Sequence, residues 1–158
     1  MQISTHIRIV FGVVLAAVAL VPAGQAASLS QNESELLGAM NEVRATHDLR
    51  PLRVDGALVR AARAYSTTLM RTDVFTHGSL GPRLARAGAR GPLFGENLAW
   101  GVGSRATARG IVRSWLASPG HRANLLRPGW TRIGLGARTG TFMGYSGATV
   151  VTANFAGS

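Results

Sequence analysis

The chain has 158 residues, and its 17 basic residues outnumber its 7 acidic residues. This length fits one domain with a self-sufficient hydrophobic core. The sequence contains no cysteine, so disulfide bonds are excluded as a source of stability. Every basic residue is an arginine, and the arginines are scattered without interleaved aromatic residues, which argues against specific nucleic-acid binding.

Residues 1–26 have the pattern of a secretory signal peptide. Arg8 precedes an unbroken apolar run of 13 residues at positions 9–21, and the small residues Gly24 and Ala26 follow at the positions that a signal peptidase reads. The run is shorter than the roughly 20 residues that a spanning helix needs. We therefore predict cleavage after Ala26, with Ala27 as the alternative, and no transmembrane anchor in the mature chain.

Residues 27–158 are then predicted to form a single secreted, extracellular domain. Removing Arg8 leaves 16 arginines against 7 acidic residues, a net charge of +9. Such a surface should attract anionic cell-wall polymers or lipid headgroups. An exported domain without disulfides points toward a bacterial protein.

The first predicted elements are two helices. Apolar residues at helical spacing predict a helix over residues 33–48, with His47 as a partly buried packing residue at its end. Pro51 prevents further helix, and Asp55 is placed to cap a second helix that ends near Arg71. A glycine-rich loop follows, with a short helical piece at residues 82–87, where Pro82 suits a first turn.

The second half mixes strands and helices. Residues 95–100 are predicted to form a short strand, and Ser104 is predicted to cap a third long helix that Pro119 and Gly120 stop. One further helical turn is expected at residues 121–126. Residues 130–138 and 148–155 are predicted strands, joined by the glycine-rich segment 139–147. This order indicates an α+β domain with a small antiparallel sheet covered by helices.

Three side chains are candidates for a metal site. His77, Glu96 and His121 offer two imidazoles and a carboxylate, a set that zinc accepts with a position left open. Their separations of 19 and 25 residues place each on a different element, so the spacing alone proves nothing. No organic cofactor is indicated.

Structural explanations exist for each candidate. His77 could hydrogen-bond loop backbone, His121 could cap the turn it begins, and Glu96 could be a buried carboxylate satisfied by loop amides, with Asn97 acting similarly. A serine hydrolase is disfavoured, because no serine lies in a Gly-x-Ser-x-Gly elbow. Three tryptophans are expected in the core: Trp100, Trp115 and Trp130.

Several motifs in order resemble the CAP superfamily of cysteine-rich secretory, antigen 5 and pathogenesis-related proteins. The resemblance covers residues 33–156 and fits a short bacterial branch. It rests on Leu36-Leu37, Asn41-x-x-Arg44, Pro51-Leu52, Leu58-x-x-Ala61-Ala62, Phe75-x-His77, Gly95-Glu96-Asn97-Leu98-Ala99, Trp115-x-x-Ser118-Pro119-Gly120-His121-Arg122-x-Asn124-Leu125-Leu126 and Ile133-Gly134-x-Gly136.

The resemblance implies a three-layer α-β-α sandwich with a small antiparallel sheet between helices. It also implies a cleft of two histidines and two acids that in some members binds a divalent metal. His77, Glu96 and His121 match three of these four residues, whereas Ser118 stands where the second acid is expected. A second carboxylate would have balanced the charge of an ion, so its loss weakens the case for catalysis. Asn97, Ser118 and Asn124 are expected to support the cleft.

The favoured hypothesis is a secreted, largely non-enzymatic domain that binds an extracellular ligand or partner. Its cleft would hold a divalent metal, zinc by preference, or an ordered water. The alternatives are a metal-assisted hydrolase with Glu96 as base, and a basic module that binds the cell wall through charge. The sequence does not decide the ligand or the oligomeric state.

Overall fold

The computed structural model describes residues 28–158. The predicted signal peptide and its cleavage site lie outside the described residues. In chain order the elements are α1 (Gln31–Ala45), β1 (Arg53–Val54), α2 (Gly56–Thr72), α3 (Leu80–Arg86), β2 (Leu93–Gly101), the 3₁₀ turn η1 (Gly103–Arg105), α4 (Ala108–Ala117), α5 (Pro119–Leu125), β3 (Trp130–Phe142) and β4 (Tyr145–Gly157).

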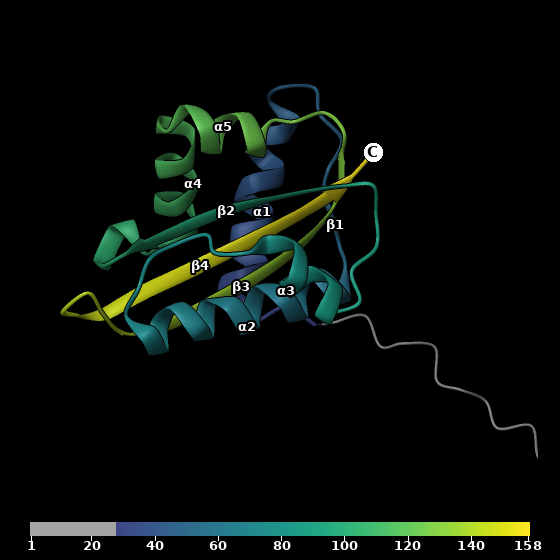
Figure 1. The fold of residues 1–158 in the computed structure, drawn as a ribbon. Helices are drawn as coiled ribbons and strands as arrows, with labels where there is room; N and C mark the ends of the chain where they lie inside the picture. Colours follow the sequence, from purple (N-terminus) through teal and green to yellow (C-terminus); the bar gives the residue numbers. More distant parts are fainter. Residues whose placement is uncertain (1–27) are drawn as a thin grey trace, which may run out of the picture.

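A four-stranded sheet in the order β1-β3-β4-β2 separates two helical layers. Helices α2 and α3 lie on one side of the sheet, while α1, α4 and α5 lie on the other (Figure 1). The predicted α+β sandwich is confirmed. The three long strands are antiparallel, but the two-residue β1 pairs in parallel with β3 and was not predicted. Its pairing is non-local and too short to leave a pattern in the sequence.

Helix α1 is shifted relative to its prediction. It begins after Ser30, whose side chain forms a capping box with Glu33, and it ends at Ala45 instead of residue 48. Asp48 has a φ of 55°, which a right-handed helix cannot accommodate. The prediction that His47 packs against the core is wrong: the residue is exposed, with Nδ1 2.9 Å from the Val43 carbonyl oxygen.

Helix α2 packs closely on β3. Asp55 caps it as predicted, accepting hydrogen bonds from the N–H groups of Ala57 and Leu58. A Cβ atom at Gly134 would overlap the backbone of Leu58, and glycine removes that obstacle. The close approach fixes α2 against the sheet, from which it presents Tyr65 toward the site described below.

The boundaries around α4 and α5 differ from the prediction. Thr107, not Ser104, caps α4, since its Oγ1 accepts the Gly110 N–H at 3.1 Å, and Ser104 lies in η1. Pro119 opens α5 after a single extended residue, Ser118, so His121 does not begin the turn. A proline at a first-turn position lacks only an N–H that would be unpaired there. Similarly, α3 begins before Pro82, at Leu80.

Strands β3 and β4 form a hairpin that is longer than predicted. Each has 13 residues, and most of segment 139–147, expected as a loop, is strand. A tight turn at Met143 and Gly144 joins them. The core on the α1 side includes Trp115 and Trp130, both 1% exposed, while Trp100 is only half-buried.

Candidate functional site

The site is built around β2, which is an edge strand of the sheet. Successive side chains of a strand point to opposite faces. Glu96 therefore faces the α2 and α3 layer, and Asn97 faces the layer that contains α5. Glu96 is hydrogen-bonded to the side chain of His77, and Asn97 is hydrogen-bonded to the backbone carbonyl of His121. The strand therefore connects the two histidines across its edge.

Glu96 is the buried acid at the centre of the site, with a side chain 3% exposed. Its Oε1 lies 2.9 Å from His77 Nδ1 and accepts a hydrogen bond from Arg83 at 3.1 Å. Its Oε2 accepts a second hydrogen bond from Arg83 at 2.8 Å. With its amide oriented to satisfy its neighbours, Asn154 donates to the same Oε2 at 3.1 Å. The carboxylate is thus held by four donors, two of them from one arginine.

Arg83 is a member of this site that the sequence analysis did not single out. Its side chain is 14% exposed, and its guanidinium carbon lies 3.4 Å from the centre of the Tyr65 ring. It also donates to the His77 carbonyl at 2.7 Å. The sequence offers no signal that separates Arg83 from 16 other arginines, because its partner Glu96 is 13 residues away on another element.

Tyr65 supports the loop that carries His77. Its hydroxyl donates to the Thr76 carbonyl at 2.7 Å. Burial raises the pKa of Tyr65, and Glu96 adds to this rise while Arg83 opposes it. The phenol is therefore neutral at physiological pH and acts as a hydrogen-bond donor.

His121 approaches from α5 on the other side of β2. Its Nδ1 lies 2.9 Å from Ser118 Oγ, and its backbone carbonyl accepts a hydrogen bond from Asn97 at 3.0 Å. The His77 and His121 rings lie 6.4 Å apart between centroids, with planes inclined by 29°. Burial, and secondarily the neighbouring His77, lower the pKa of His121, so its neutral imidazole prevails at pH 7.

An amide network holds α5 against β2. Asn124 donates to the Glu96 carbonyl at 2.9 Å and to Asn97 Oδ1 at 3.1 Å. The structure therefore brings His77, Glu96 and His121 together as the sequence analysis expected, with Asn97, Ser118 and Asn124 beside them. Glu96 is satisfied by side chains, not by the loop amides considered above.

The arrangement does not present a ready-made metal site. Both Glu96 oxygens accept hydrogen bonds from Arg83, so a cation at this carboxylate would meet the guanidinium charge. Within residues 28–158, no three histidine, aspartate or glutamate side chains cluster closely enough to hold a metal ion. Metal binding by His77, Glu96 and His121 stays a prediction, and it requires Arg83 to move.

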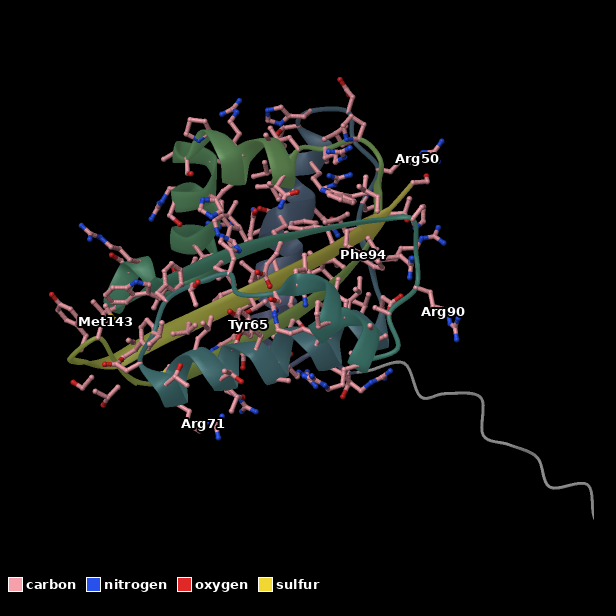
Figure 2. The ribbon with its side chains drawn as sticks, viewed as in Figure 1. Arg50, Tyr65, Arg71, Arg90, Phe94 and Met143 are labelled. Carbon is pink, nitrogen blue, oxygen red and sulfur yellow. The ribbon has the colours of Figure 1, made fainter. Side chains whose placement is uncertain are left out.

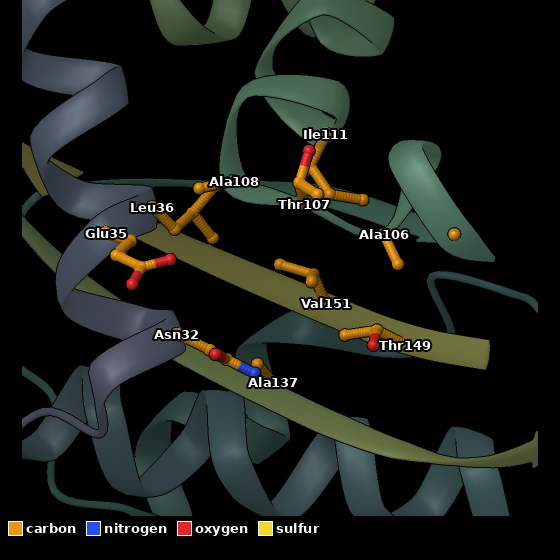
Figure 3. A pocket seen from close by; sticks show the side chains of 11 residues that line it. Asn32, Glu35, Leu36, Ala106, Thr107, Ala108, Ile111, Ala137, Thr149 and Val151 are labelled. Carbon is orange, nitrogen blue, oxygen red and sulfur yellow. The ribbon is translucent and has the colours of Figure 1, made fainter. Parts of the chain in front are cut away.

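A separate pocket of about 230 Å³ lies on the other face of the sheet, between α1 and α4 (Figure 3). Apolar side chains from α1, α4 and β4 line it, including Leu36, Ile111 and Val151, and Glu35 and Thr107 stand at its polar edge. None of the candidate site residues lines this pocket, so the titratable site and the apolar cavity are distinct features.

Comparison with protein-family models gives a match to the cysteine-rich secretory protein family, known as CAP, over residues 37–155. This chain belongs to the CAP family. The match lies within the domain predicted for residues 27–158 and covers all the site residues described above.

The CAP domain has bacterial relatives. It is 33% identical over 114 residues to the Bacillus subtilis protein YkwD, covering 69% of this chain and 43% of that protein. A crystal structure of an extracellular protein with an SCP domain from Bacillus anthracis is similar, with a TM-score of 0.66 and 28% identity over 80% of this chain and 40% of the other. The chain thus spans less than half the length of these relatives.

An outer surface protein from Borrelia burgdorferi shares the fold, with a TM-score of 0.69 and 22% identity over 83% of this chain and 96% of that one. These likenesses confirm the CAP fold inferred from the ordered motifs. Within residues 28–158 of this CAP domain, no helix is both long and apolar enough to cross a membrane.

Proposed function

We propose that this protein is a secreted, non-enzymatic CAP domain that binds an extracellular ligand or partner at the site formed by His77 and His121. The signal-peptide pattern of residues 1–26 supports export. The description of the Bacillus anthracis relative as extracellular supports it too. Whether the site binds a ligand or catalyses a reaction depends on whether the Glu96 carboxylate is free to contact a substrate.

The observation that carries this proposal is the pairing of Glu96 with Arg83. A general base needs a lone pair that can reach a substrate proton. The Glu96 carboxylate is 3% exposed and accepts hydrogen bonds from Arg83 at 2.8 and 3.1 Å. Both carboxylate oxygens of Glu96 are engaged by the guanidinium of Arg83, so neither is free to meet a substrate. This disfavours the hydrolase in which Glu96 acts as base.

The two imidazoles are better placed for recognition. The side chain of His77 is 55% exposed, and both Nδ1 atoms contact protein oxygens, Glu96 Oε1 and Ser118 Oγ. These contacts orient the rings and leave the Nε2 atoms for a ligand. A ligand with polar groups spaced to meet both Nε2 atoms would fit this arrangement.

An NMR screen tests the proposal. Small polar compounds added to the full domain should shift the ring resonances of His77 and His121 together. Binding should weaken at least about tenfold in both His77→Ala and His121→Ala. His47→Ala is the matched control, because this exposed histidine lies outside the cleft. Turnover of ester or peptide substrates that is lost in Glu96→Gln would overturn the non-enzymatic assignment.

Metal binding is the open clause of the proposal. Zinc titrated into the wild-type protein should bind only if the Glu96 carboxylate releases Arg83 and accepts the metal. The zinc ion and the guanidinium are both positive and would repel each other at the same carboxylate. A site abolished by His77→Ala and by His121→Ala would support zinc as a cofactor. If calorimetry detects no zinc binding, the protein has no metal at this site, and the proposed binding of an extracellular ligand there is unaffected.

A second candidate is a basic module that adsorbs to an anionic cell-wall polymer. Charge is unevenly distributed: residues 56–92 contain six arginines and one acidic residue, Asp73. Binding driven by this face should disappear above about 0.5 M salt, where screening shortens to a few ångströms. Insensitivity to His77→Ala and His121→Ala would distinguish it from ligand binding in the cleft.

A further inference from the structure

Apolar side chains are exposed at one end of the molecule, where the β3 and β4 hairpin turns. Val74, Phe75, Met143 and Tyr145 are 52%, 41%, 47% and 56% exposed. They are four of the five exposed large apolar residues in residues 28–158; the fifth is Val54. We call these four residues the hairpin-end patch. Scattered apolar residues are ordinary on a surface, but a contiguous group marks an interaction site.

The patch is contiguous although its residues come from two segments. Phe75 packs edge-on against Phe142, with ring centroids 6.3 Å apart. Trp100 contacts both Phe142 and Tyr145, at centroid distances of 5.6 and 5.7 Å. Figure 2 shows Met143 projecting at the end of the molecule opposite Phe94 and Arg90.

Met143 is an unusual residue for its position. It has a φ of 51° and is followed by Gly144 at 80°, so both turn residues adopt the left-handed conformation. Such two-residue hairpin turns favour asparagine, aspartate and glycine, because other side chains crowd the backbone there. The Met143 N–H donates to Asp73, which fixes the turn. Because the Met143 side chain is exposed, it contributes little buried apolar surface to the stability of the fold. Folding alone therefore does not explain why a methionine occupies this strained position.

Two exposed arginines lie close in sequence to residues that form or support the patch. Arg71 lies in the last turn of α2, just before Val74, and Arg105 lies in η1, which follows the strand that carries Trp100. The acidic residue within this region, Asp73, accepts the Met143 N–H. An apolar tip with arginines beside it is complementary to a surface that has an anionic outer layer over an apolar interior.

We propose that the hairpin-end patch docks the domain on an anionic phospholipid bilayer. A turn that projects from the sheet presents a convex tip, which suits insertion among headgroups better than the flat, larger contact of a stable protein interface. Tyrosine and tryptophan favour the boundary between hydrocarbon and water. Methionine and phenylalanine enter the apolar layer, and the arginines pair with lipid phosphates. This docking is independent of the ligand cleft.

Sedimentation with vesicles tests the proposal on the mature domain. Wild-type protein should bind vesicles of equal parts phosphatidylglycerol and phosphatidylcholine, and bind pure phosphatidylcholine at least about tenfold more weakly. Met143→Asn and Tyr145→Ser should each reduce binding to the anionic vesicles several-fold. Met143→Asn should also leave the melting temperature unchanged or raise it, because asparagine suits the left-handed turn. Lost binding in this variant therefore cannot come from unfolding.

Control variants separate the patch from other features. Val54→Thr alters the exposed apolar residue outside the patch and should bind vesicles as wild type does. His77→Ala should also bind as wild type, which separates this result from the cleft. The proposal is overturned if the wild-type protein does not sediment with anionic vesicles. It is also overturned if Met143→Asn and Tyr145→Ser bind undiminished, because the arginines alone would then carry the attraction.

Discussion

Two arginines of this domain, the buried Arg44 and the partly buried Arg83, satisfy their guanidinium groups in opposite ways. Arg44 in α1 is 0% exposed and donates to the backbone carbonyls of Arg50, Leu125, Arg127 and Trp130, at 2.8 to 3.4 Å. Arg83 in α3 pairs with the carboxylate of Glu96 and lies against Tyr65. One arginine joins backbone segments, while the other neutralises a side chain.

The contrast between Arg44 and Arg83 shows that an arginine in the interior of a protein can have two different roles. The carbonyls around Arg44 belong to the segment that follows α1 and to the stretch from the end of α5 to the start of β3, so its fork of donors fixes those segments in space. Burial lowers the pKa of Arg44, yet an arginine remains charged at any physiological pH. The partner of Arg83 is an anion, and an anion can in principle accept a different cation. The first region is structural, and the second is open to exchange.

The largest expected effect is the loss of the Arg44 donors. Arg44→Met keeps much of the apolar stem but leaves buried carbonyls without partners, which should lower the free energy of unfolding by about 4 kcal/mol. Urea denaturation of residues 27–158 measures this. Arg50→Met is the control, since Arg50 is exposed, and should change stability by less than about 0.5 kcal/mol. Equal effects of Arg44→Met and Arg50→Met would show that the buried hydrogen bonds of Arg44 do not stabilise the domain as expected.

Removing the other guanidinium should have a smaller but more informative effect. Arg83→Met leaves Glu96 buried without its cation and should cost about 3 kcal/mol. Zinc should then bind through Glu96 and the two histidines at least tenfold more tightly than in wild type and restore part of the stability. Calorimetry and thermal denaturation with zinc measure both. If Arg83→Met gains no zinc affinity, the carboxylate is not open to exchange. Arg83→Met with Glu96→Gln should recover stability without zinc.

The ion pair between Glu33 and Arg63 allows the comparison to be extended to pH. Glu33 is buried, which by itself would raise its pKa, but hydrogen bonds from Arg63 and Ser30 outweigh this and lower it. Because the folded-state pKa lies below the unfolded value of about 4.3, the pair stabilises the domain above that pH. This stability is lost as the pH falls through the folded pKa.

Glu33→Gln measures this contribution. At pH 7 it should reduce the free energy of unfolding by about 2 kcal/mol. As the pH falls below about 4, the difference from wild type should shrink, because Glu33 in the wild type is then protonated. Urea denaturation from pH 3 to pH 7 tests the sign. A difference that grows toward low pH would contradict it.

The smallest expected effect concerns the contact between Ser118 and His121. Ser118→Ala removes the oxygen 2.9 Å from His121 Nδ1, which solvent can replace because the site is partly exposed. The free energy of unfolding should fall by less than about 1 kcal/mol. Thermal denaturation measures it, and a larger loss would make Ser118 a structural member of the cleft.

Much of this arrangement is readable from the sequence. Helical periodicity and the Asp55 cap predict α2 almost to its ends, and the ordered motifs predict that His77, Glu96 and His121 lie near one another. The failures have local physical causes. Ser104 lies within the 3₁₀ turn η1, so Thr107 caps α4 instead. His47 follows the last residue of α1, where its helical phase no longer applies.

Arg83 shows what a single sequence leaves undetermined. Its identity is shared with every other basic residue of the chain, and its role follows from the direction in which the short α3 presents it. Only the packing of α3 over Tyr65 brings it to Glu96. The sequence thus predicts the members of the site that lie in recognisable motifs, and misses Arg83, Tyr65 and Asn154, which tertiary packing brings to it.

The alternation of Glu96 and Asn97 on β2 makes the cleft sensitive to strand register. Glu96 is paired opposite Asn154, and Asn97 opposite Ala153, along β4. A slip of one residue would turn both side chains to the wrong faces, placing the carboxylate beside α5 and separating it from Arg83. The buried charge would then lack its partner. Assembly of the cleft and correct pairing of this edge strand are therefore one event, and misaligned chains are penalised by the same residues that form the site.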